Sequence, residues 1–274
     1  MPFVRALLAS SHPGPSAVVT VLALLLGIAV GLPLDRLALL TAAVLCGQLS
    51  VGISNDAGDH ARDRAVGRTD KPLARGDVPI AAAWTVAAVL FAAALVLSAL
   101  LGVGMLIAHG VALVSAWAYN ALLKSTLFSV APFVVSFGIF PSLATLSAEP
   151  PALAAPWAWV AGAALGVAVH LTNVLPDLDD DRRTGIRGLV HRMGPRPATV
   201  LAAASTLAGA VAVVVGTGAA VLPVVLAVVV AALAVATVAR TVRRGPDRVV
   251  FRLVMGSALL LAVSLVAAPG ALTA

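Results

Sequence analysis

Charged residues are scarce in this sequence: Asp, Glu, Lys and Arg together make up 11% of its 274 residues. Hydrophobic residues account for 61%, and the mean hydropathy is +1.04. Soluble domains typically have about 25% charged and about 45–50% apolar residues. The shortage of charge therefore excludes an ordinary soluble domain and indicates a protein integrated in the lipid bilayer.

Cysteine and acidic residues are also few. The single cysteine, Cys46, lies in an apolar run, which excludes an internal disulfide and a cysteine metal cluster. Acidic residues number 12 against 18 Lys and Arg, which gives a net charge of +6. In a membrane protein basic residues usually mark cytoplasmic loops. The excess of positive charge therefore does not indicate a nucleic-acid partner.

Long apolar runs are what the sequence has in abundance. A transmembrane helix needs roughly 20 apolar residues, and nine runs approach that length. We therefore predict an all-α, multi-pass fold in one domain over residues 1–274, with nine transmembrane helices around a central cavity. The stretch from Arg5 to Pro15, broken by prolines, is interpreted as a short interfacial lead-in. The predicted spans are 16–34, 36–54, 80–100, 102–119, 127–147, 156–175, 198–216, 219–239 and 250–269.

The placement of basic residues supports this count. With nine spans, the N-terminus and the loops after every second span lie on one side, and they carry 17 of the 18 Lys and Arg. Arg36 is alone on the other side. The positive-inside rule then predicts that the N-terminus and these polar loops are cytoplasmic. The arginines of 240–252, with Arg182 and Arg192, are interpreted mainly as such topology signals.

The segment Asn55–Asp63 has the strongest chemical signal. Asp56, Asp59 and Asp63 have helical spacing and share one face of a helix. Three like charges on one face repel one another unless a cation lies between them, and Mg²⁺ prefers oxygen ligands. The alternative is a solvated helix end in which Asp63 pairs with a neighbouring arginine.

A second copy of this segment follows 118 residues later. Asn173, Asp177 and Asp181 repeat the spacing Asn-x3-Asp-x3-Asp, and seven identities occur between 55–79 and 173–197. Four spans separate the copies, which predicts a parallel repeat with both motif loops on the same membrane side. Ligand sites often lie between such repeats. Asp179 and Asp180 are adjacent, so one of them points away from the metal face.

The residues around the motifs favour an amphiphilic substrate. Mg²⁺ commonly completes its coordination with phosphate oxygens, so paired carboxylate clusters indicate a diphosphate ligand. Lys71 and Arg75 follow the first cluster and Arg183 follows the second, where they could hold that diphosphate. The apolar bundle would contain a hydrocarbon tail. A prenyl diphosphate matches both parts.

These motifs resemble the two signatures of the UbiA-type intramembrane prenyltransferases. The match extends to Lys71-Pro72-Leu73-Ala74-Arg75-Gly76 and to Tyr119 with Lys124. The resemblance implies ionisation of a prenyl diphosphate that depends on Mg²⁺, with two ions bound, followed by transfer to a lipophilic or aromatic acceptor such as a quinone precursor. It implies metal binding by Asp56, Asp59, Asp63, Asp177 and Asp181. It implies diphosphate binding by Asn55, Lys71, Arg75, Tyr119, Lys124 and Arg183.

The sequence departs from the family pattern at several positions. Lys71 stands where arginine is more frequent, and Gly188 where threonine is common. Pro176 precedes Asp177 and predicts that the second cluster begins a new helix after a kink. Aromatic residues make up only 4% of the chain. The candidates for stabilising a cation by ring faces are Trp117, Tyr119, Phe133 and Phe137.

Polar residues inside spans add candidates for the cavity, since such residues are costly in a membrane and often functional. Gln48, His170 and Asn173 share faces with the motifs. A structural, hydrogen-bonded role is equally compatible with His170 and is favoured for His109. Two other functions keep the same carboxylates: a terpene cyclase without an external acceptor, and a divalent-cation transporter.

Overall fold

The computed structural model describes residues 3–245, 247–268 and 270–273, and every regular element within them is helical. This confirms the predicted all-α class. The longer helices are α1 (Phe3–Ser10), α2 (Pro13–Ala29), α3 (Leu34–Ala65), α5 (Ile80–Leu101), α6 (Val103–Ala118), α7 (Ala131–Leu146), α8 (Pro156–Val174), α11 (Pro195–Gly216), α12 (Val221–Arg244) and α13 (Arg248–Val266). Shorter helices are α4 (Pro72–Arg75), α9 (Leu178–Arg183) and α10 (Leu189–Met193), with single turns η1 (Tyr119–Leu123), η2 (Leu127–Val130), η3 (Leu175–Asp177) and η4 (Ala271–Thr273).

The number of spans agrees with the sequence. Within the described residues, eight helices are long and apolar enough to cross a membrane. The pair α1 and α2, bent by 68° at their junction, gives a ninth when counted as one span. The last predicted span, 250–269, ends on a residue outside the described ones.

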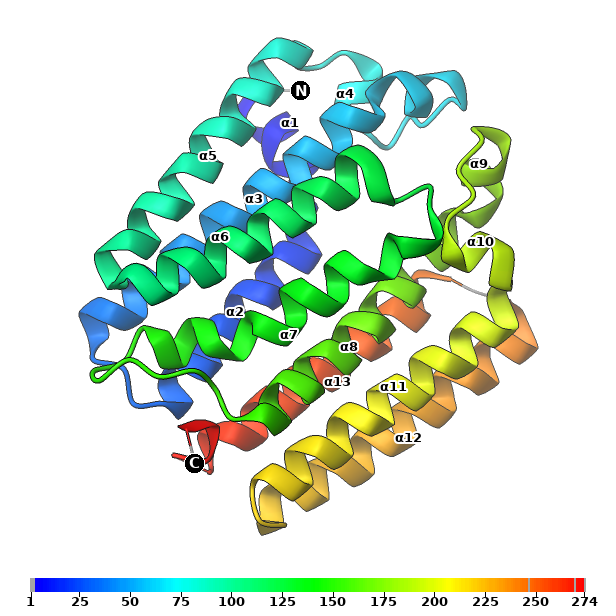
Figure 1. Ribbon diagram of the computed structural model, residues 1–274. Helices are drawn as coiled ribbons and strands as arrows, with labels where there is room; N and C mark the ends of the chain where they lie inside the picture. Colours follow the sequence, from blue (N-terminus) through cyan, green and yellow to red (C-terminus); the bar gives the residue numbers. More distant parts are fainter. Residues whose placement is uncertain (1–2, 246, 269, 274) are drawn as a thin grey trace.

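The long helices form a closed ring. Within the described residues, each of α2, α3, α5, α6, α7, α8, α11, α12 and α13 packs against the next, and α13 packs back against α2. The N-terminal helix lies at one end of the bundle and the C-terminus at the other (Figure 1). The short helices α4, α9 and α10 gather at the end where the chain begins. We call this the polar end.

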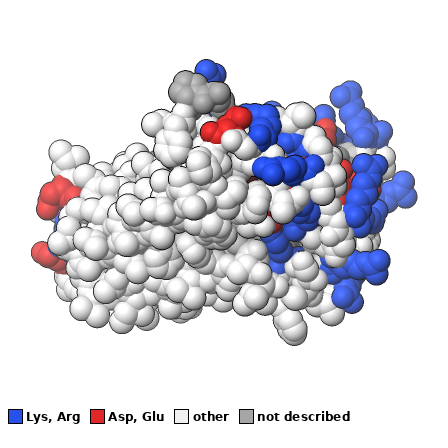
Figure 2. Space-filling view, turned by 90° about the horizontal axis from the view of Figure 1, so that it is seen from above, with Lys and Arg blue, Asp and Glu red and all other residues white. Residues whose placement is uncertain are grey.

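Charge is distributed along the same axis. Lys and Arg crowd one end of the molecule, while most of the long face in this view is uncharged (Figure 2). Arg36 lies at the opposite end, where its Nη1 is 2.6 Å from Glu149 Oε1. An apolar belt between two polar ends is the surface that a bilayer requires.

The two motif helices end differently. The helix that contains the predicted span 36–54 is longer than that span, because α3 continues to Ala65 and carries the whole first motif as one helix. A helix satisfies its own backbone in water as well as in lipid, so the membrane boundary does not end it. By contrast, α8 ends at Val174 and a 3₁₀ turn containing Pro176 leads into α9. The predicted break at Pro176 is confirmed.

Candidate active site

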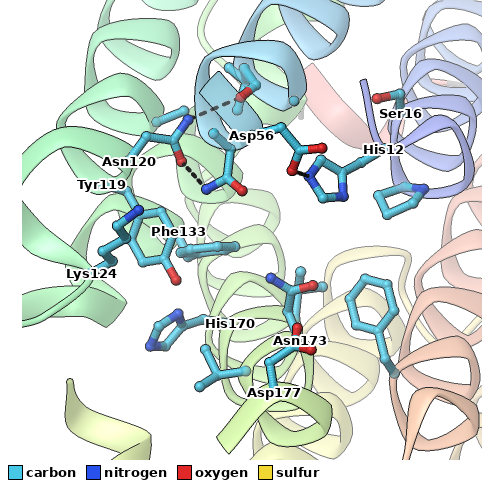
Figure 3. Close-up of a pocket in the computed structure, with 18 of the residues that line it drawn as sticks. His12, Ser16, Asp56, Tyr119, Asn120, Lys124, Phe133, His170, Asn173 and Asp177 are labelled. Carbon is cyan, nitrogen blue, oxygen red and sulfur yellow. Dashed lines mark hydrogen bonds and ion pairs between the residues drawn. The ribbon is translucent and has the colours of Figure 1, made fainter. Parts of the chain in front are cut away.

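A cavity of about 920 Å³ opens among the helices at the polar end. Its wall comes from α2, α3, α6, α7, α8 and α13, together with the turns that follow α6 and α8. The side chains that face one space are Asp56 from α3, Tyr119 and Asn120 from η1, His170 and Asn173 from α8, and Asp177 from η3 (Figure 3). Both motifs therefore contribute to a single site.

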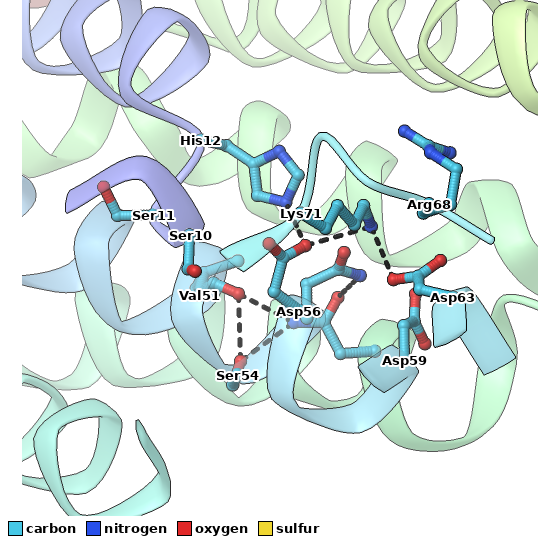
Figure 4. Close-up of polar contacts among 12 residues, drawn as sticks. Ser10, Ser11, His12, Val51, Ser54, Asp56, Asp59, Asp63, Arg68 and Lys71 are labelled. Atoms are coloured by element: carbon cyan, nitrogen blue, oxygen red, sulfur yellow. Dashed lines mark hydrogen bonds and ion pairs between the residues drawn. The ribbon is translucent and has the colours of Figure 1, made fainter. Parts of the chain in front are cut away.

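The first motif is buried and ion-paired. Asp56 is 3% exposed, and Asp59 and Asp63 are each 7% exposed. Lys71 Nζ lies 3.0 Å from Asp56 Oδ1 and 2.9 Å from Asp63 Oδ2, so it bridges two turns of α3 (Figure 4). The second of these contacts is an ion pair without hydrogen-bond geometry. The same oxygen of Asp56 also contacts His12, whose Nε2 is 3.0 Å from Oδ1.

Asp59 lies between two further cations. Lys124 Nζ contacts its Oδ1, and Arg62 Nη2 is 2.6 Å from its Oδ2. Lys124 belongs to the turn after η1, whereas Arg62 lies one turn along α3. The carboxylates that would repel one another are thus compensated by cations from three segments.

The second motif is more open. Arg68 Nη1 is 3.2 Å from Asp177 Oδ1, and His191 Nε2 is 3.2 Å from Asp181 Oδ2. Asp180 lines the cavity, while the Asp179 side chain is 85% exposed and lies outside the lining. Asp180 is therefore the member of the adjacent pair that faces the site.

A π-helical turn connects the first motif to Lys124. In η1, Asn120 donates from Nδ2 to the Val51 carbonyl at 3.0 Å and to Ser54 Oγ at 2.9 Å. Asn55 Nδ2 in turn donates to Asn120 Oδ1 at 3.0 Å. This network fixes the Asn55 amide beside the aspartates. Single π-helical turns are frequently found at functional sites.

The three cavity candidates from within the spans, Gln48, His170 and Asn173, all line the cavity. His170 Nε2 lies 3.1 Å from Ser129 Oγ, while its buried Nδ1 has no hydrogen-bond partner within the described residues. His109 also lines the cavity but is held by Ser98 Oγ, 2.7 Å from its Nδ1.

Aromatic rings border the polar end of the cavity. Tyr119 meets Phe133 edge to face, with ring centroids 5.0 Å apart, and Phe133 lies 4.9 Å from the His170 ring. Phe137 lines the wall below them. The prediction for Trp117 is wrong, because its ring packs between Phe91 and Trp84 and does not line the cavity.

Two predicted diphosphate ligands do not reach the cavity. Arg75 ends α4 and binds Asp77 Oδ2 at 2.5 Å and the Thr69 carbonyl at 2.5 Å. The Arg183 side chain is 74% exposed and lies 3.6 Å from Asp180. Both of these Arg75 contacts are with residues of its own loop, on either side of α4. The sequence shows that both arginines lie near the motifs, but it does not determine whether their side chains point into the cavity.

The structure also adds residues that carried no motif. His12, Arg68, Asn120 and His191 all line the cavity and contact motif residues. The sequence offered a reason to consider two of them for the site: Asn120 is a polar residue next to Tyr119, and His191 lies ten residues after Asp181. His12 is 44 residues from Asp56, and nothing in the sequence links them.

Glycines explain one departure from the family pattern and one feature of the repeat. A Cβ atom at Gly188 would lie 2.4 Å from the Lys124 carbonyl oxygen, so threonine could not fit there. Gly67 and Gly185, at matching positions of the repeat, both have left-handed φ, of 73° and 84°. Each follows the last turn of a motif helix, where glycine is favoured. The parallel repeat itself stays a prediction.

Protonation follows from these contacts. Burial lowers the pKa of Lys71, but Asp56 and Asp63 outweigh this effect and the pKa is raised. Burial also lowers the pKa of Lys124, and Asp59 offsets only part of that shift. Hydrogen bonding to Asp70 raises the pKa of Arg68, which therefore stays charged beside Asp177. Within the described residues, no three Asp, Glu, His or Cys side chains converge as a preformed metal site.

Comparisons with known proteins agree with this architecture. The sequence model of the UbiA prenyltransferase family matches residues 16–262. The structure is similar to the apo form of a UbiA homologue from Aeropyrum pernix K1, with a TM-score of 0.74, 19% identity, and coverage of 97% of this chain and 98% of that one. No curated protein matches the sequence.

Two other solved structures have the same fold. A UbiA homologue from Archaeoglobus fulgidus bound to GPP and Mg²⁺ has a TM-score of 0.70 at 14% identity, covering 96% of this chain and 99% of that one. A digeranylgeranylglyceryl phosphate synthase has a TM-score of 0.70 at 13% identity, with coverage of 98% and 99%. The family match extends over nearly the whole chain, so this protein belongs to the UbiA prenyltransferase family and is a membrane-embedded prenyltransferase.

Proposed function

We propose that this protein transfers a prenyl group from a prenyl diphosphate to an acceptor within the membrane, with Mg²⁺ as cofactor. One observation carries the proposal: two aspartate motifs with their basic partners meet at one end of a cavity whose other walls are apolar and aromatic. A diphosphate matches the first region and an isoprenoid chain matches the second. The GPP and Mg²⁺ bound to the A. fulgidus homologue support the same substrate class here.

The donor set suits Mg²⁺. Asp56, Asp59, Asp63, Asp177 and Asp181 offer hard oxygen ligands, and Lys71 already lies as a cation between two of them. These residues would hold two ions, which would neutralise the diphosphate charge when bound. The lysine and the ions would compete for the same carboxylates.

The protein's own cations would hold the leaving group. Lys71, Lys124 and Arg68 line the cavity and can donate hydrogen bonds to diphosphate oxygens. The bond between C1 and the bridging oxygen would break, and its electron pair would leave with the diphosphate. Asn55 and Tyr119 complete the proposed diphosphate contacts. Arg75 and Arg183 would need a rearrangement of their loops to take part.

The aromatic rings would act on the allylic cation. Tyr119, Phe133 and Phe137 line the cavity next to the motifs, and ring faces attract cations. The apolar wall excludes water, which would otherwise capture the cation. The acceptor would then form a bond to C1 and release a proton. We propose an aromatic or quinone-precursor acceptor, with the motif loops on the cytoplasmic side.

Product analysis tests this function. Purified protein, Mg²⁺ and a panel of prenyl diphosphates are incubated with and without aromatic acceptors, and products are identified by mass spectrometry. A prenylated acceptor supports the transferase. A cyclic hydrocarbon or alcohol formed without acceptor supports a cyclase instead, and no consumption of any prenyl diphosphate overturns both.

Variants of the motifs test the site. Asp59→Ala and Asp177→Ala should each lower turnover by about a hundredfold or more, because each removes a carboxylate that would hold the Mg²⁺ ions against the reacting diphosphate. Asp179→Ala is the matched control, since Asp179 lies in the same acidic run but outside the cavity. Unchanged activity of either motif variant, with Mg²⁺ still required, would contradict the assignment.

A further inference from the structure

Three polar side chains lie in the apolar part of the cavity, away from both aspartate motifs. Gln48 comes from α3, His109 from α6 and Ser136 from α7, and all three line the cavity. Polar side chains within a membrane span are costly and are often functional. The lining residues one or two turns away on the same helices are apolar: Val44, Leu113, Phe140 and Leu143. We call Gln48, His109 and Ser136 the polar floor.

The polar floor lies at a definite depth below the motifs. Gln48 precedes Asn55 by seven residues of α3, so it lies about 10 Å deeper at the usual helix rise. His109 precedes the turn η1 by ten residues of α6, which places it about 15 Å below that turn. Ser136 Oγ donates to the Ala112 carbonyl at 3.0 Å, on the turn of α6 that follows His109. Three helices therefore bring polar groups to one region of the cavity.

A second buried polar residue orients the imidazole of His109. Ser98 is 0% exposed and His109 is 3% exposed. Ser98 donates its hydroxyl proton to the Ala94 carbonyl at 2.7 Å, so its 2.7 Å contact with His109 is a hydrogen bond from Nδ1–H to Oγ. In this tautomer Nε2 is an acceptor, and within the described residues it has no hydrogen-bond partner. That acceptor is available to whatever fills the cavity beside it.

Gln48 adds further unmet hydrogen-bonding groups. Within the part of the chain that the structure describes, its side-chain amide makes no hydrogen bond. An amide offers two N–H donors and a carbonyl acceptor. Water molecules in the cavity can satisfy these groups together with His109 Nε2, because a polar and roomy site retains water. A hydrocarbon chain cannot, and it would leave each of them unpaired.

We propose that the polar floor limits the prenyl diphosphate to a short chain of about ten carbons. This inference rests on the proposed function. With carbon–carbon bonds of about 1.5 Å, an extended C10 chain is about 10 Å long and a C20 chain about 20 Å. A C10 chain that starts at the motifs ends at the level of Gln48. A C20 chain would cover both Gln48 and His109 and displace the water from them, which carries a free-energy cost for each unpaired group.

Steady-state kinetics with geranyl (C10), farnesyl (C15) and geranylgeranyl (C20) diphosphates test the inference, with diphosphate release as the readout. The wild type should have a kcat/KM for C10 at least about tenfold above that for C20. Gln48→Met and His109→Phe remove the polar groups with little change in side-chain size. Each should raise the ratio of kcat/KM for C20 to that for C10 by about tenfold to a hundredfold, since unpaired buried groups then disappear.

Val44→Ala is the matched control, because it adds space one turn from Gln48 without changing polarity. It should change the C20 to C10 ratio by less than about threefold. A Val44→Ala variant that relaxes the selection as much as Gln48→Met would show that space sets the limit, and would overturn the inference. Equal kcat/KM for C10 and C20 in the wild type would overturn it as well.

A donor with a polar chain end gives an independent test. Geranyl diphosphate with a hydroxyl on its terminal methyl group can hydrogen-bond to the polar floor. The wild type should use it with a kcat/KM at least equal to that for geranyl diphosphate. In the Gln48→Met, His109→Phe double variant this relative kcat/KM should fall at least about tenfold, because the hydroxyl is then buried without a partner. An unchanged value in the double variant would contradict the proposal.

A binding measurement decides the inference without turnover. The probes are the unreactive thiolodiphosphate analogues of the C10 and C20 substrates, added with Mg²⁺ to protein in nanodiscs. The C10 analogue should raise the melting temperature of the wild type more than the C20 analogue does, and the double variant should lose this difference. Equal stabilisation by both analogues, or by neither, contradicts the polar floor. If the wild type binds C10 selectively but releases no diphosphate from any substrate, the proposed function alone has failed.

Discussion

Lys71 shows how one side chain can hold a highly charged site together. Its ammonium group joins Asp56 to Asp63 across seven residues of α3, and its side chain is only 17% exposed. Those two carboxylates raise its pKa despite the opposing effect of burial. Lys71 therefore stays charged at neutral pH and compensates two buried anions.

Removing this charge should destabilise the protein when divalent cations are absent. We expect Lys71→Met to lower the free energy of unfolding by about 3 kcal/mol, because breaking a buried pair leaves uncompensated charge. Mg²⁺ should restore part of the loss in this variant more than in the wild type. Denaturant unfolding in detergent, with EDTA or Mg²⁺, measures both effects, with Lys71→Arg as the charge-preserving control. A Lys71→Met variant as stable as the wild type in EDTA would refute this account.

The turn η1 shows how an irregular element can place side chains. The cavity is lined by two residues of this π-helical turn, Tyr119 and Asn120, and by the residue directly after it, Lys124. An α-helix advances about 100° per residue, so removing one residue would rotate whatever follows. The wider turn thus sets the direction of Lys124 toward Asp59.

Deleting Ala121 should therefore separate Lys124 from Asp59. Ala121 is exposed, so the deletion removes little packing. We expect turnover to fall by at least about a hundredfold, comparable to the loss of a single charged donor. Product formation by the purified deletion variant is the measurement, and Ala121→Leu, which keeps the register, should stay active. Full activity of the deletion variant would show that the π-helical turn is dispensable.

The N-terminus of α13 is capped by Asp247. Asp247 accepts hydrogen bonds from the Val249 and Val250 amides and pairs with Arg240 at 2.9 Å. Hydrogen bonding to Arg240 lowers the pKa of Asp247. Since the folded-state pKa lies below the unfolded one, this contribution is complete above about pH 4 and is lost as pH falls through the folded value.

Two variants separate the cap from the ion pair. Asp247→Ala should lower the free energy of unfolding at pH 7 by about 1 kcal/mol, the usual value of an N-cap. Asp247→Asn keeps a capping oxygen, so it should cost less and should make stability less dependent on pH below about 4. Thermal unfolding between pH 3 and 7 checks both. An unchanged pH dependence in Asp247→Asn would contradict the assigned protonation.

At the scale of the whole molecule, charge separates the two ends. Lys and Arg lie almost entirely at the polar end (Figure 2). The positive-inside rule predicts that this end is cytoplasmic. Two exposed residues lie near opposite ends of the candidate span Pro156–Arg183: Leu153, in the loop before α8, and Asp179, in α9.

Cysteine labelling tests this orientation. In a Cys46→Ala background, a membrane-impermeant maleimide added to intact cells should label Leu153→Cys at least about tenfold more than Asp179→Cys, because a charged reagent does not cross the bilayer. Permeabilised cells should label both equally, which provides the control. The reverse pattern would place the motif loops outside the cell.

Much of the fold could be predicted because it follows from composition and periodicity. The spans are continuous apolar runs, and Asp56, Asp59 and Asp63 share a face because α3 is one regular helix. The contacts between segments could not be predicted in this way. His12 reaches Asp56 because α1 and α2 meet at a 68° bend. Arg68 reaches Asp177 across the cavity mouth, a partner chosen by tertiary packing and not by spacing.

The closure of the ring by α13 against α2 has a consequence for biogenesis. The first long helix and the last are neighbours, so the cavity is walled only after the ribosome has released nearly the entire chain. Until then, a nascent chain already contains both aspartate motifs, but the side of the bundle between α2 and the missing α13 is open to lipid. The dry compartment that the proposed allylic cation would require is therefore the last feature of this protein to be assembled.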